Sequence, residues 1–196
     1  MGNFEMNDKQ VKRLFIAVKI NPDNSFLGWY KQIKELLQEE DIRWTKTENF
    51  HITLQFLGDT NVRSIPVISS ALKLSVVSHK PFRFSLSGIG VFRSLSYPKV
   101  FWIGLKNTGE LSLIKESIDD QLKSIIDLKV NENFKPHLSL GRMKRIKDIK
   151  HFRELITRYN DHEFLEVGVE EVILYESILH REGPVYNVLD IIAIRV

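Results

Sequence analysis

Apolar residues along the chain form two patterns, short continuous runs typical of buried strands and stripes with a period of three to four residues typical of helices. The stripes predict four helices, at residues 26–37, 65–76, 111–125 and 149–159. The runs predict strands at residues 13–20, 50–57, 82–86, 100–105 and 137–140, then a strand-rich tail from 164 with a turn around 183–184. Helices and strands mixed in this order, with antiparallel pairs and crossover connections, favour an α+β fold over a doubly wound sheet.

Two segments of the chain repeat a strand–helix–strand unit. Phe15 precedes His51 by 36 residues, and Phe101 precedes His137 by the same interval. The approach to each histidine is also alike, because the tripeptide Glu-Asn-Phe leads to both, with Lys-Pro inserted before the second. A repeat of this kind predicts two similar lobes that face one another.

The repeat places an imidazole and a hydroxyl on one face of a strand in each lobe. Side chains at positions i and i+2 of a strand share a face, so His51 lies beside Thr53, and His137 lies beside Ser139. The residues that alternate with them are expected to point into the core, namely Ile52, Leu54, Leu138 and Leu140. The sequence therefore predicts a common cleft with two histidines and two hydroxyls, and with Arg142 close by.

These residue types suit a displacement at phosphorus. Two imidazoles with an ordinary pKa near ~6.5 can act as base and acid at neutral pH. Two hydroxyls and a guanidinium can donate hydrogen bonds to a phosphoryl group. Water can then attack the phosphorus while an alkoxide leaves as a protonated hydroxyl. Such a reaction needs neither a metal ion nor a covalent intermediate, so we expect no cofactor.

Each of these features also has a structural interpretation. A single histidine in a strand usually has no chemical role, and threonine and serine are common in sheets. Two histidines could begin a zinc site, which needs a third protein ligand at a defined spacing, and the sequence shows none. The basic cluster from Arg142 to Lys150 is more often a solvated face than a nucleic-acid site, although it and Lys135 are candidates for contacts with an RNA backbone.

Aromatic rings near the two histidines are candidates for stacking on a nucleobase, which is worth about 1–3 kcal/mol. The rings closest in the chain are Phe50, Phe56, Phe134 and Tyr186. Strand alternation from His51 predicts that Phe56 points into the core. The sequence does not choose among these four rings.

Composition narrows the class of protein. The 196 residues contain no cysteine, which excludes a disulfide framework, a thiolate zinc site, an iron–sulfur cluster and a cysteine nucleophile. The net charge of +3 gives only mild attraction to an anionic partner. No apolar run approaches the ~20 residues of a membrane span, and the polar N-terminal segment is not a signal peptide. We expect a cytoplasmic protein with no membrane contact and no obligate protein partner, a monomer with a single two-lobed domain over residues 1–196.

The two histidine motifs, HITLQFLG at 51–58 and HLSLGR at 137–142, resemble the paired signatures of the two-histidine phosphoesterase superfamily. Within it the chain is most similar to the bacterial and archaeal RNA 2′,3′-cyclic phosphodiesterases, also labelled 2′-5′ RNA ligases. The similarity runs from about residue 12 to 192 and includes RLFIAV at 13–18, GIGVF at 88–92, PKVFWIGL at 98–105 and YESILHREGPVYNVL at 175–189. Ser139 stands where many members have threonine, which keeps the hydroxyl.

The resemblance implies two pseudo-symmetric α+β lobes around a central cleft, each an antiparallel sheet with helices on its outer side. It implies metal-free hydrolysis of a 2′,3′-cyclic phosphate, on RNA ends or nucleosides, to a 2′-phosphomonoester, with weak 2′-5′ ligation in reverse. By this resemblance His51 is the acid and His137 the base, in roles that could be exchanged. The phosphate would be held by three further side chains, Thr53, Ser139 and Arg142.

Other functions stay open at the level of sequence. A related two-histidine enzyme could act on 2′-5′ oligonucleotides or on a small cyclic-phosphate metabolite. An RNA-binding relative without catalysis would be expected to have lost one of the four histidine and hydroxyl residues, and all four are intact. A metal-dependent hydrolase would lose its activity on chelation.

Overall fold

The computed structural model describes residues 11–129 and 133–195. The polar N-terminal segment considered above, and Glu132 of the second Glu-Asn-Phe tripeptide, lie outside the described residues. The α-helices are α1 (Asn24–Leu36), α2 (Ile65–Val76), α3 (Gly109–Leu122) and α4 (Ile149–Arg158). The strands are β1 (Val11–Lys19), β2 (Ile42–Trp44), β3 (His51–Asn61), β4 (Phe82–Ser94), β5 (Tyr97–Lys106), β6 (Leu138–Met143), β7 (Glu163–Val169), β8 (Glu171–His180) and β9 (Gly183–Ala193).

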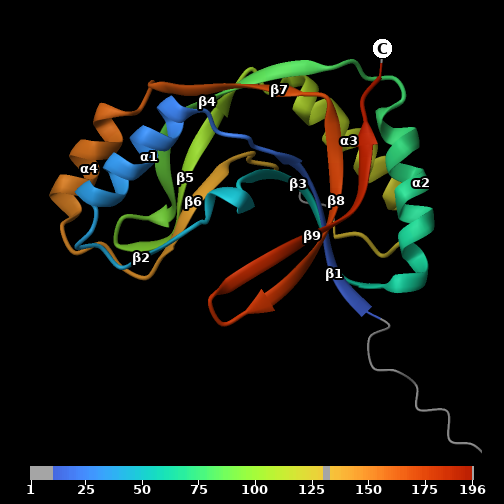
Figure 1. Ribbon diagram of the computed structural model, residues 1–196, viewed down its shortest axis with the longest axis horizontal. Coiled ribbons are helices and arrows are strands. Elements are labelled where there is room, and N and C mark those ends of the chain that lie inside the picture. The colour runs from blue at the N-terminus through green and yellow to red at the C-terminus, as the bar shows by residue number, and fades with distance from the viewer. Residues whose placement is uncertain (1–10, 130–132, 196) are drawn as a thin grey trace, which may run out of the picture.

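The described strands join into one curled sheet (Figure 1). Its order is β7-β4-β5-β6-β3-β1-β8-β9, and β2 pairs with β6 beside this path. The two middle strands meet through one pair of residues, Ile52 of β3 and Leu138 of β6. Each half of the sheet, β3-β1-β8-β9 and β6-β5-β4-β7, is antiparallel, so the α+β fold with two matched lobes is confirmed.

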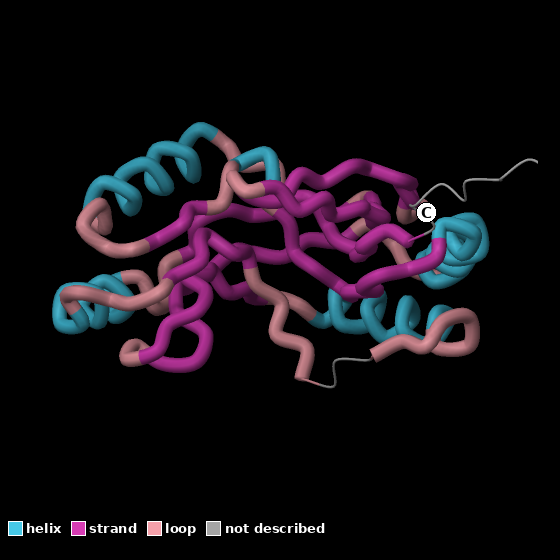
Figure 2. The backbone as a smooth tube through the Cα atoms, turned by 90° about the horizontal axis from the view of Figure 1, so that it is seen from below, coloured by secondary structure: helices cyan, strands magenta, loops and turns pink. Residues whose placement is uncertain are grey.

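The helices flank the sheet as two pairs, α1 with α4 and α2 with α3 (Figure 1). Seen from below, the strands occupy the middle of the molecule, with helices toward both ends (Figure 2). Helix α1 follows β1 but packs against the other half, where Trp29 lies 4.3 Å from Phe164 of β7 and 5.8 Å from Tyr159 after α4, between ring centroids. The crossover helix of one half therefore covers the other half, which holds the two halves in one body.

The predicted apolar stripes of α1 and α3 are buried within the helices. In α1 the Asp23 carboxylate accepts a hydrogen bond from the Phe26 amide at 2.8 Å and so begins the helix, and Phe26 and Ile33 lie in the core. The same holds for the stripe of α3, where every predicted apolar residue from Leu111 to Leu122 is fully buried. All four predicted helices are present, although Ile125 lies beyond the end of α3 and Ile149 of α4 is 37% exposed.

The structure departs from the predicted local structure at several points. The short strand β2 had no signal of its own, because three residues cannot display a period. Strand β3 continues to Asn61 rather than ending at Gly58, since Gly58 adopts φ +68° and passes through an irregularity in the pairing with β1. The last turn lies at 181–182, and Gly183 already begins β9.

Candidate active site

The predicted site forms where the two halves of the sheet meet. His51 is the first residue of β3, His137 directly precedes β6, and the Ile52–Leu138 pair lies between these strands. The alternation predicted after each histidine is correct as far as Leu54 in the first motif and Leu140 in the second. The four residues assigned to the core are all at most 3% exposed: Ile52, Leu54, Leu138 and Leu140.

Both histidines are held by the same kind of backbone contact. The Nδ1 atom of His51 lies 2.7 Å from the carbonyl oxygen of Asn49, and Nδ1 of His137 lies 2.8 Å from that of Lys135. A carbonyl oxygen can only accept, so each Nδ1 carries the proton. This assigns the tautomer in which Nε2 of each neutral ring has a free lone pair, and Nε2 is the atom available to exchange a proton with a substrate.

Burial lowers the pKa of both histidines below the ordinary value, and this is the largest effect on each. The contacts with the two carbonyls act in the opposite direction. The charge of His137 lowers the pKa of His51 further, so the two rings are close enough to interact electrostatically. Both histidines therefore lose their proton at a lower pH than an imidazole in water does.

Aromatic rings that the sequence did not single out for this purpose surround the two histidines. Phe15 and Tyr186 lie 5.0 and 5.2 Å from the His51 ring, and Phe92 lies 4.6 Å from the His137 ring, between centroids. The Tyr186 and Phe92 contacts are edge-to-face. Tyr186 was considered only for a nucleobase, and no sequence signal links Phe92 in β4 to a histidine 45 residues later.

A cavity of about 720 Å³ opens at this junction. Its lining includes His51, Ser139 and Arg142 of the predicted site. The other two predicted site residues, Thr53 and His137, do not line the cavity. Thr53 is nevertheless on β3 two positions after His51, opposite Ala17 of β1. The structure thus places three predicted residues on one cavity and the other two beside it.

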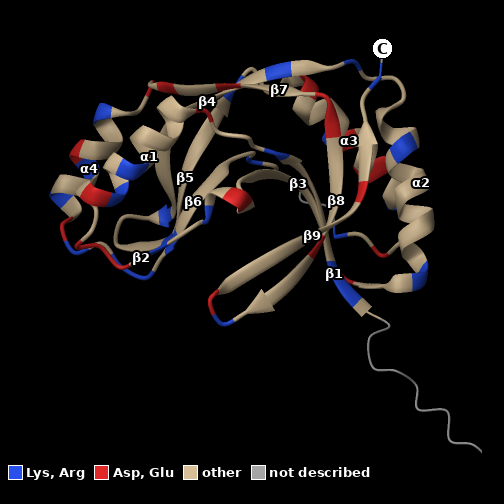
Figure 3. Ribbon diagram, in the orientation of Figure 1, with Lys and Arg blue, Asp and Glu red and all other residues tan. Residues whose placement is uncertain are grey.

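Arg142 is exposed on β6, opposite Arg43 of β2 and Val100 of β5. Its charge acts on Tyr186, lowering the pKa of a phenol that burial raises more strongly. Lysine and arginine residues lie on β2 and the neighbouring strands, across from the tip of the β8–β9 hairpin (Figure 3). Arg142 is therefore the member of the 142–150 basic cluster that joins the cavity, whereas Lys144 and Lys150 are exposed outside its lining.

The prediction for Phe56 was wrong. Its side chain is 68% exposed and lines the cavity, whereas Gln55 is buried. The register explains this. On β1, the neighbouring residues Ala17 and Ile16 pair with Thr53 and Gln55 of β3, so Leu54 is an extra residue in β3, a bulge. The bulge reverses the alternation after Leu54 and turns Phe56 out of the core.

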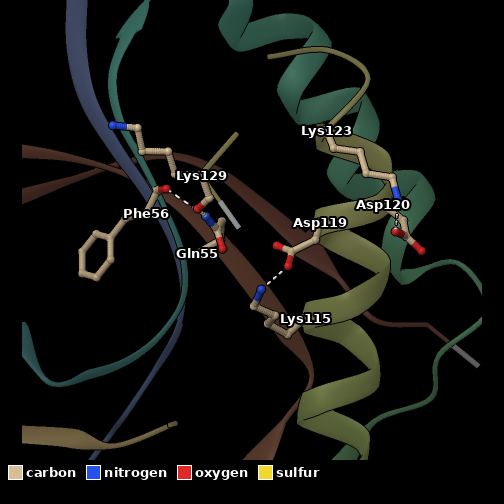
Figure 4. A network of polar contacts seen from close by, with 7 residues as sticks. All are labelled: Gln55, Phe56, Lys115, Asp119, Asp120, Lys123 and Lys129. Atoms are coloured by element: carbon tan, nitrogen blue, oxygen red, sulfur yellow. Dashed lines mark hydrogen bonds and ion pairs between the residues drawn. The ribbon is translucent and has the colours of Figure 1, made fainter. Parts of the chain in front are cut away.

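Gln55 ties the end of the bulge to the segment that leads to the second motif (Figure 4). Its amide donates to the carbonyl oxygens of Phe56 and Lys129, both at 3.0 Å. Behind it in the core, Lys115 and Asp119 of α3 form a buried ion pair, and the Lys115 ammonium lies 5.8 Å from the Phe134 ring centroid. Lys129 and Phe134, which both precede His137 in the chain, are therefore each held by a contact with another element.

The four candidate aromatic rings have different surroundings. Phe50 is 1% exposed and packs against Phe26 and Tyr30, which removes it from the site. The Phe134 ring makes a cation–π contact with the Lys115 ammonium. Phe56 and Tyr186 remain on the cavity.

Within 11–129 and 133–195, no three His, Asp or Glu side chains are grouped so that they could hold a metal ion. The helices of the same ranges are too short or too polar to cross a membrane.

The curled α+β sheet and the matched histidines define a class of phosphoesterase, and comparison with known proteins agrees. A family model described as LigT like Phosphoesterase matches residues 18–102. An RNA 2′,3′-cyclic phosphodiesterase of Archaeoglobus fulgidus is 35% identical over 176 residues, which are 89% of this chain and 96% of the relative. A protein of the same name from Methanocaldococcus jannaschii is 33% identical, over 90% of this chain and 98% of its own.

Solved structures show the same fold. TT0787 of Thermus thermophilus has a TM-score of 0.73 and 25% identity, covering 93% of this chain and 98% of that one. LigT of E. coli complexed with 3′-AMP has a TM-score of 0.70 and 21% identity, with the same coverage. The chain belongs to the LigT-like phosphoesterase family.

Proposed function

We propose that this protein hydrolyses the 2′,3′-cyclic phosphate at an RNA end to a 2′-phosphomonoester. The observation that carries the proposal is the matched pair of histidines. In each, Nδ1 donates to a carbonyl oxygen two residues earlier, which keeps the proton on Nδ1 and leaves Nε2 available. The relatives named as RNA 2′,3′-cyclic phosphodiesterases support the choice of substrate.

The reaction needs one base and one acid. Nε2 of neutral His137 takes a proton from water, whose oxygen forms a bond to phosphorus. The bond from phosphorus to the 3′ oxygen breaks, and Nε2–H of cationic His51 gives its proton to that oxygen. The phosphate stays on the 2′ oxygen. These roles can be exchanged between the two rings, because their backbone contacts are alike.

The phosphate carries negative charge that must be held during the reaction. We assign Thr53 and Ser139 to its non-bridging oxygens as hydroxyl donors and Arg142 to the cavity rim as a cation. Ser139 and Arg142 line the cavity with His51, which supports this assignment. A 5′-hydroxyl that attacks the phosphorus of the cyclic phosphate in place of water would displace the same 3′ oxygen and form a 2′-5′ linkage, and hydrolysis dominates in dilute solution.

Product analysis tests the proposal. An RNA that ends in a 2′,3′-cyclic phosphate is incubated with the protein in EDTA, and the position of the phosphate is determined. We expect a 2′-phosphate. A 3′-phosphate product would mean that the 2′ oxygen leaves instead. If EDTA abolishes turnover and added metal ions restore it, the metal-free mechanism is contradicted. A panel with 2′-5′ oligonucleotides and small cyclic phosphates separates the related activities.

The oligomeric state, the cellular location and the absence of an obligate partner stay predictions. A monomer that acts in the cytoplasm is compatible with an RNA end as the substrate. Binding of RNA without turnover is the competing function, and it would leave the cyclic phosphate intact in the experiment above.

A further inference from the structure

The tip of the β8–β9 hairpin leaves the sheet and reaches across the cavity. β8 pairs with β1 as far as Glu176, opposite Leu14. Beyond that point, in the part of the chain that the structure describes, β8 pairs with β9 alone, from Ser177–Tyr186 to His180–Gly183. We call residues 177–186 the ribbon. Figure 1 shows it extending away from the sheet toward β2.

A two-stranded ribbon is marginally stable by itself, so its other contacts decide where it lies. Two side chains of the opposite segment hold it. Arg43 of β2 donates to the carbonyl oxygen of Arg181 at 2.8 Å, and the Asn49 amide donates to that of Pro184 at 3.0 Å. These hydrogen bonds fix the ribbon as a wall of the cavity, which it lines with Leu179, Pro184 and Tyr186 among others.

Asn49 also holds His51, through a different atom. Its carbonyl oxygen fixes Nδ1 of His51 at 2.7 Å, while its side-chain amide fixes the ribbon. The ribbon in turn presses Tyr186 edge-on against the His51 ring, at 5.2 Å and 89°. His51 is thus held from two sides, and Asn49 takes part in both contacts.

The second histidine lacks this arrangement. Nδ1 of His137 is held by the carbonyl of Lys135, a residue whose side chain is exposed, and its aromatic neighbour Phe92 comes from β4 within the sheet. The two histidines therefore have matching contacts to a backbone carbonyl, but only the residue that supplies the carbonyl to His51 is also bonded to the ribbon.

We propose that Asn49 is a positioning residue, which holds the ribbon and Tyr186 against His51 and so keeps this ring aligned for proton transfer. This inference rests on the proposed function. The Asn49→Ala variant removes the amide but keeps the backbone carbonyl, so it breaks the link to Pro184 alone.

The test measures kinetics and the titration of His51 in the full-length protein. In N49A we expect kcat on a cyclic-phosphate RNA to fall by about tenfold or more, because misaligned catalytic groups can cost up to ~10² in rate. We expect KM to change by less than about twofold. With the ribbon loosened, water reaches His51, so its pKa measured by NMR should rise toward ~6.5 while that of His137 stays constant. Charged or titratable groups near His51 include His137, Tyr186, Lys19 opposite it on β1, and Arg142 on the same cavity, and N49A leaves all four in place.

Two further variants sharpen the test. Asn61 accepts a hydrogen bond from the Arg63 amide at 2.9 Å, away from the cavity, so N61A is a matched control that should change neither kcat nor the titration. If Asn49 acts through Tyr186, N49A should have a smaller effect on kcat in a Tyr186→Leu background than in the native chain.

Several outcomes would overturn the inference: a kcat in N49A equal to that of the native protein, a lower kcat with unchanged His51 titration, or additive effects of N49A and Y186L. A native protein without turnover would instead contradict the proposed function. The titration of His51 would still decide the role of Asn49 in that case, because it needs no substrate.

Discussion

The Tyr30 hydroxyl lies 3.1 Å from the carbonyl oxygen of Leu140 and 2.7 Å from that of Thr45. Leu140 belongs to the second histidine motif, and Thr45 precedes the first by six residues. One phenol in helix α1 therefore links the segments that carry both histidines. Its burial raises the pKa of the phenol, so Tyr30 stays protonated and remains a donor.

Replacing Tyr30 with phenylalanine removes this donor. The carbonyl oxygen of Leu140 keeps the Thr45 amide as a donor at 2.8 Å, whereas that of Thr45 loses Tyr30. Because an unsatisfied buried polar group costs about 1–3 kcal/mol, we expect the free energy of unfolding to fall by that amount. Urea denaturation measures it. Tyr97→Phe is the control, since Tyr97 is 75% exposed and its loss should change stability by less than about 0.5 kcal/mol. Equal stability of Y30F and the native protein would show that the link contributes little.

Removing either histidine should abolish most of the activity. We expect His51→Ala and His137→Ala each to lower kcat in EDTA by at least about a hundredfold, since a placed acid or base contributes about 10²–10⁴ in rate. His151→Ala is the control, because His151 is exposed in α4 and lies outside the cavity lining. Undiminished turnover by H51A or H137A would remove that histidine from the mechanism.

The pH dependence follows from the lowered pKa of both histidines. The base must be neutral, and a lowered pKa keeps it neutral to lower pH. The acid must be charged, and a lowered pKa makes it lose its proton at lower pH. Both limbs of the profile of kcat/KM, which reports the free enzyme, therefore move in the acidic direction. We expect a maximum below about pH 6.5 and a falling rate at higher pH. A maximum well above pH 7 would contradict the lowered values.

Phe50 and Phe56 should respond in opposite ways to truncation. Phe50→Ala leaves a cavity in the core and should cost about 3–5 kcal/mol of stability, because Phe50 is 1% exposed. Phe56→Ala should cost little stability, because its ring is exposed on the cavity. If a base stacks on that ring, F56A raises KM for an RNA end and leaves KM for an abasic cyclic phosphate unchanged. Thermal denaturation and substrate kinetics measure the two effects, and a large stability loss in F56A would contradict the bulge at Gln55.

The sequence was most informative where a period could be read. The helical stripes of α1 and α3 and the alternation around His51 and His137 are local patterns. The burial that they predict is found from Phe26 to Leu37, from Leu111 to Leu122, and at the residues that alternate with the two histidines. The alternation fails after Leu54 because a bulge depends on how β3 pairs with β1, which the order of residues in β3 does not reveal.

By itself, then, the sequence determined the α+β class, the four helices, and which imidazoles and hydroxyls share a strand face, because local periodicity reports which side of an element is buried. Only the tertiary structure decided the rest. It brought Asn49 to the ribbon, Phe92 to His137 and Tyr30 to both motifs, and it turned Phe56 into the cavity. These contacts join residues far apart in the chain, and they depend on strand register and on the path of the ribbon, which form only when the two halves of the sheet assemble.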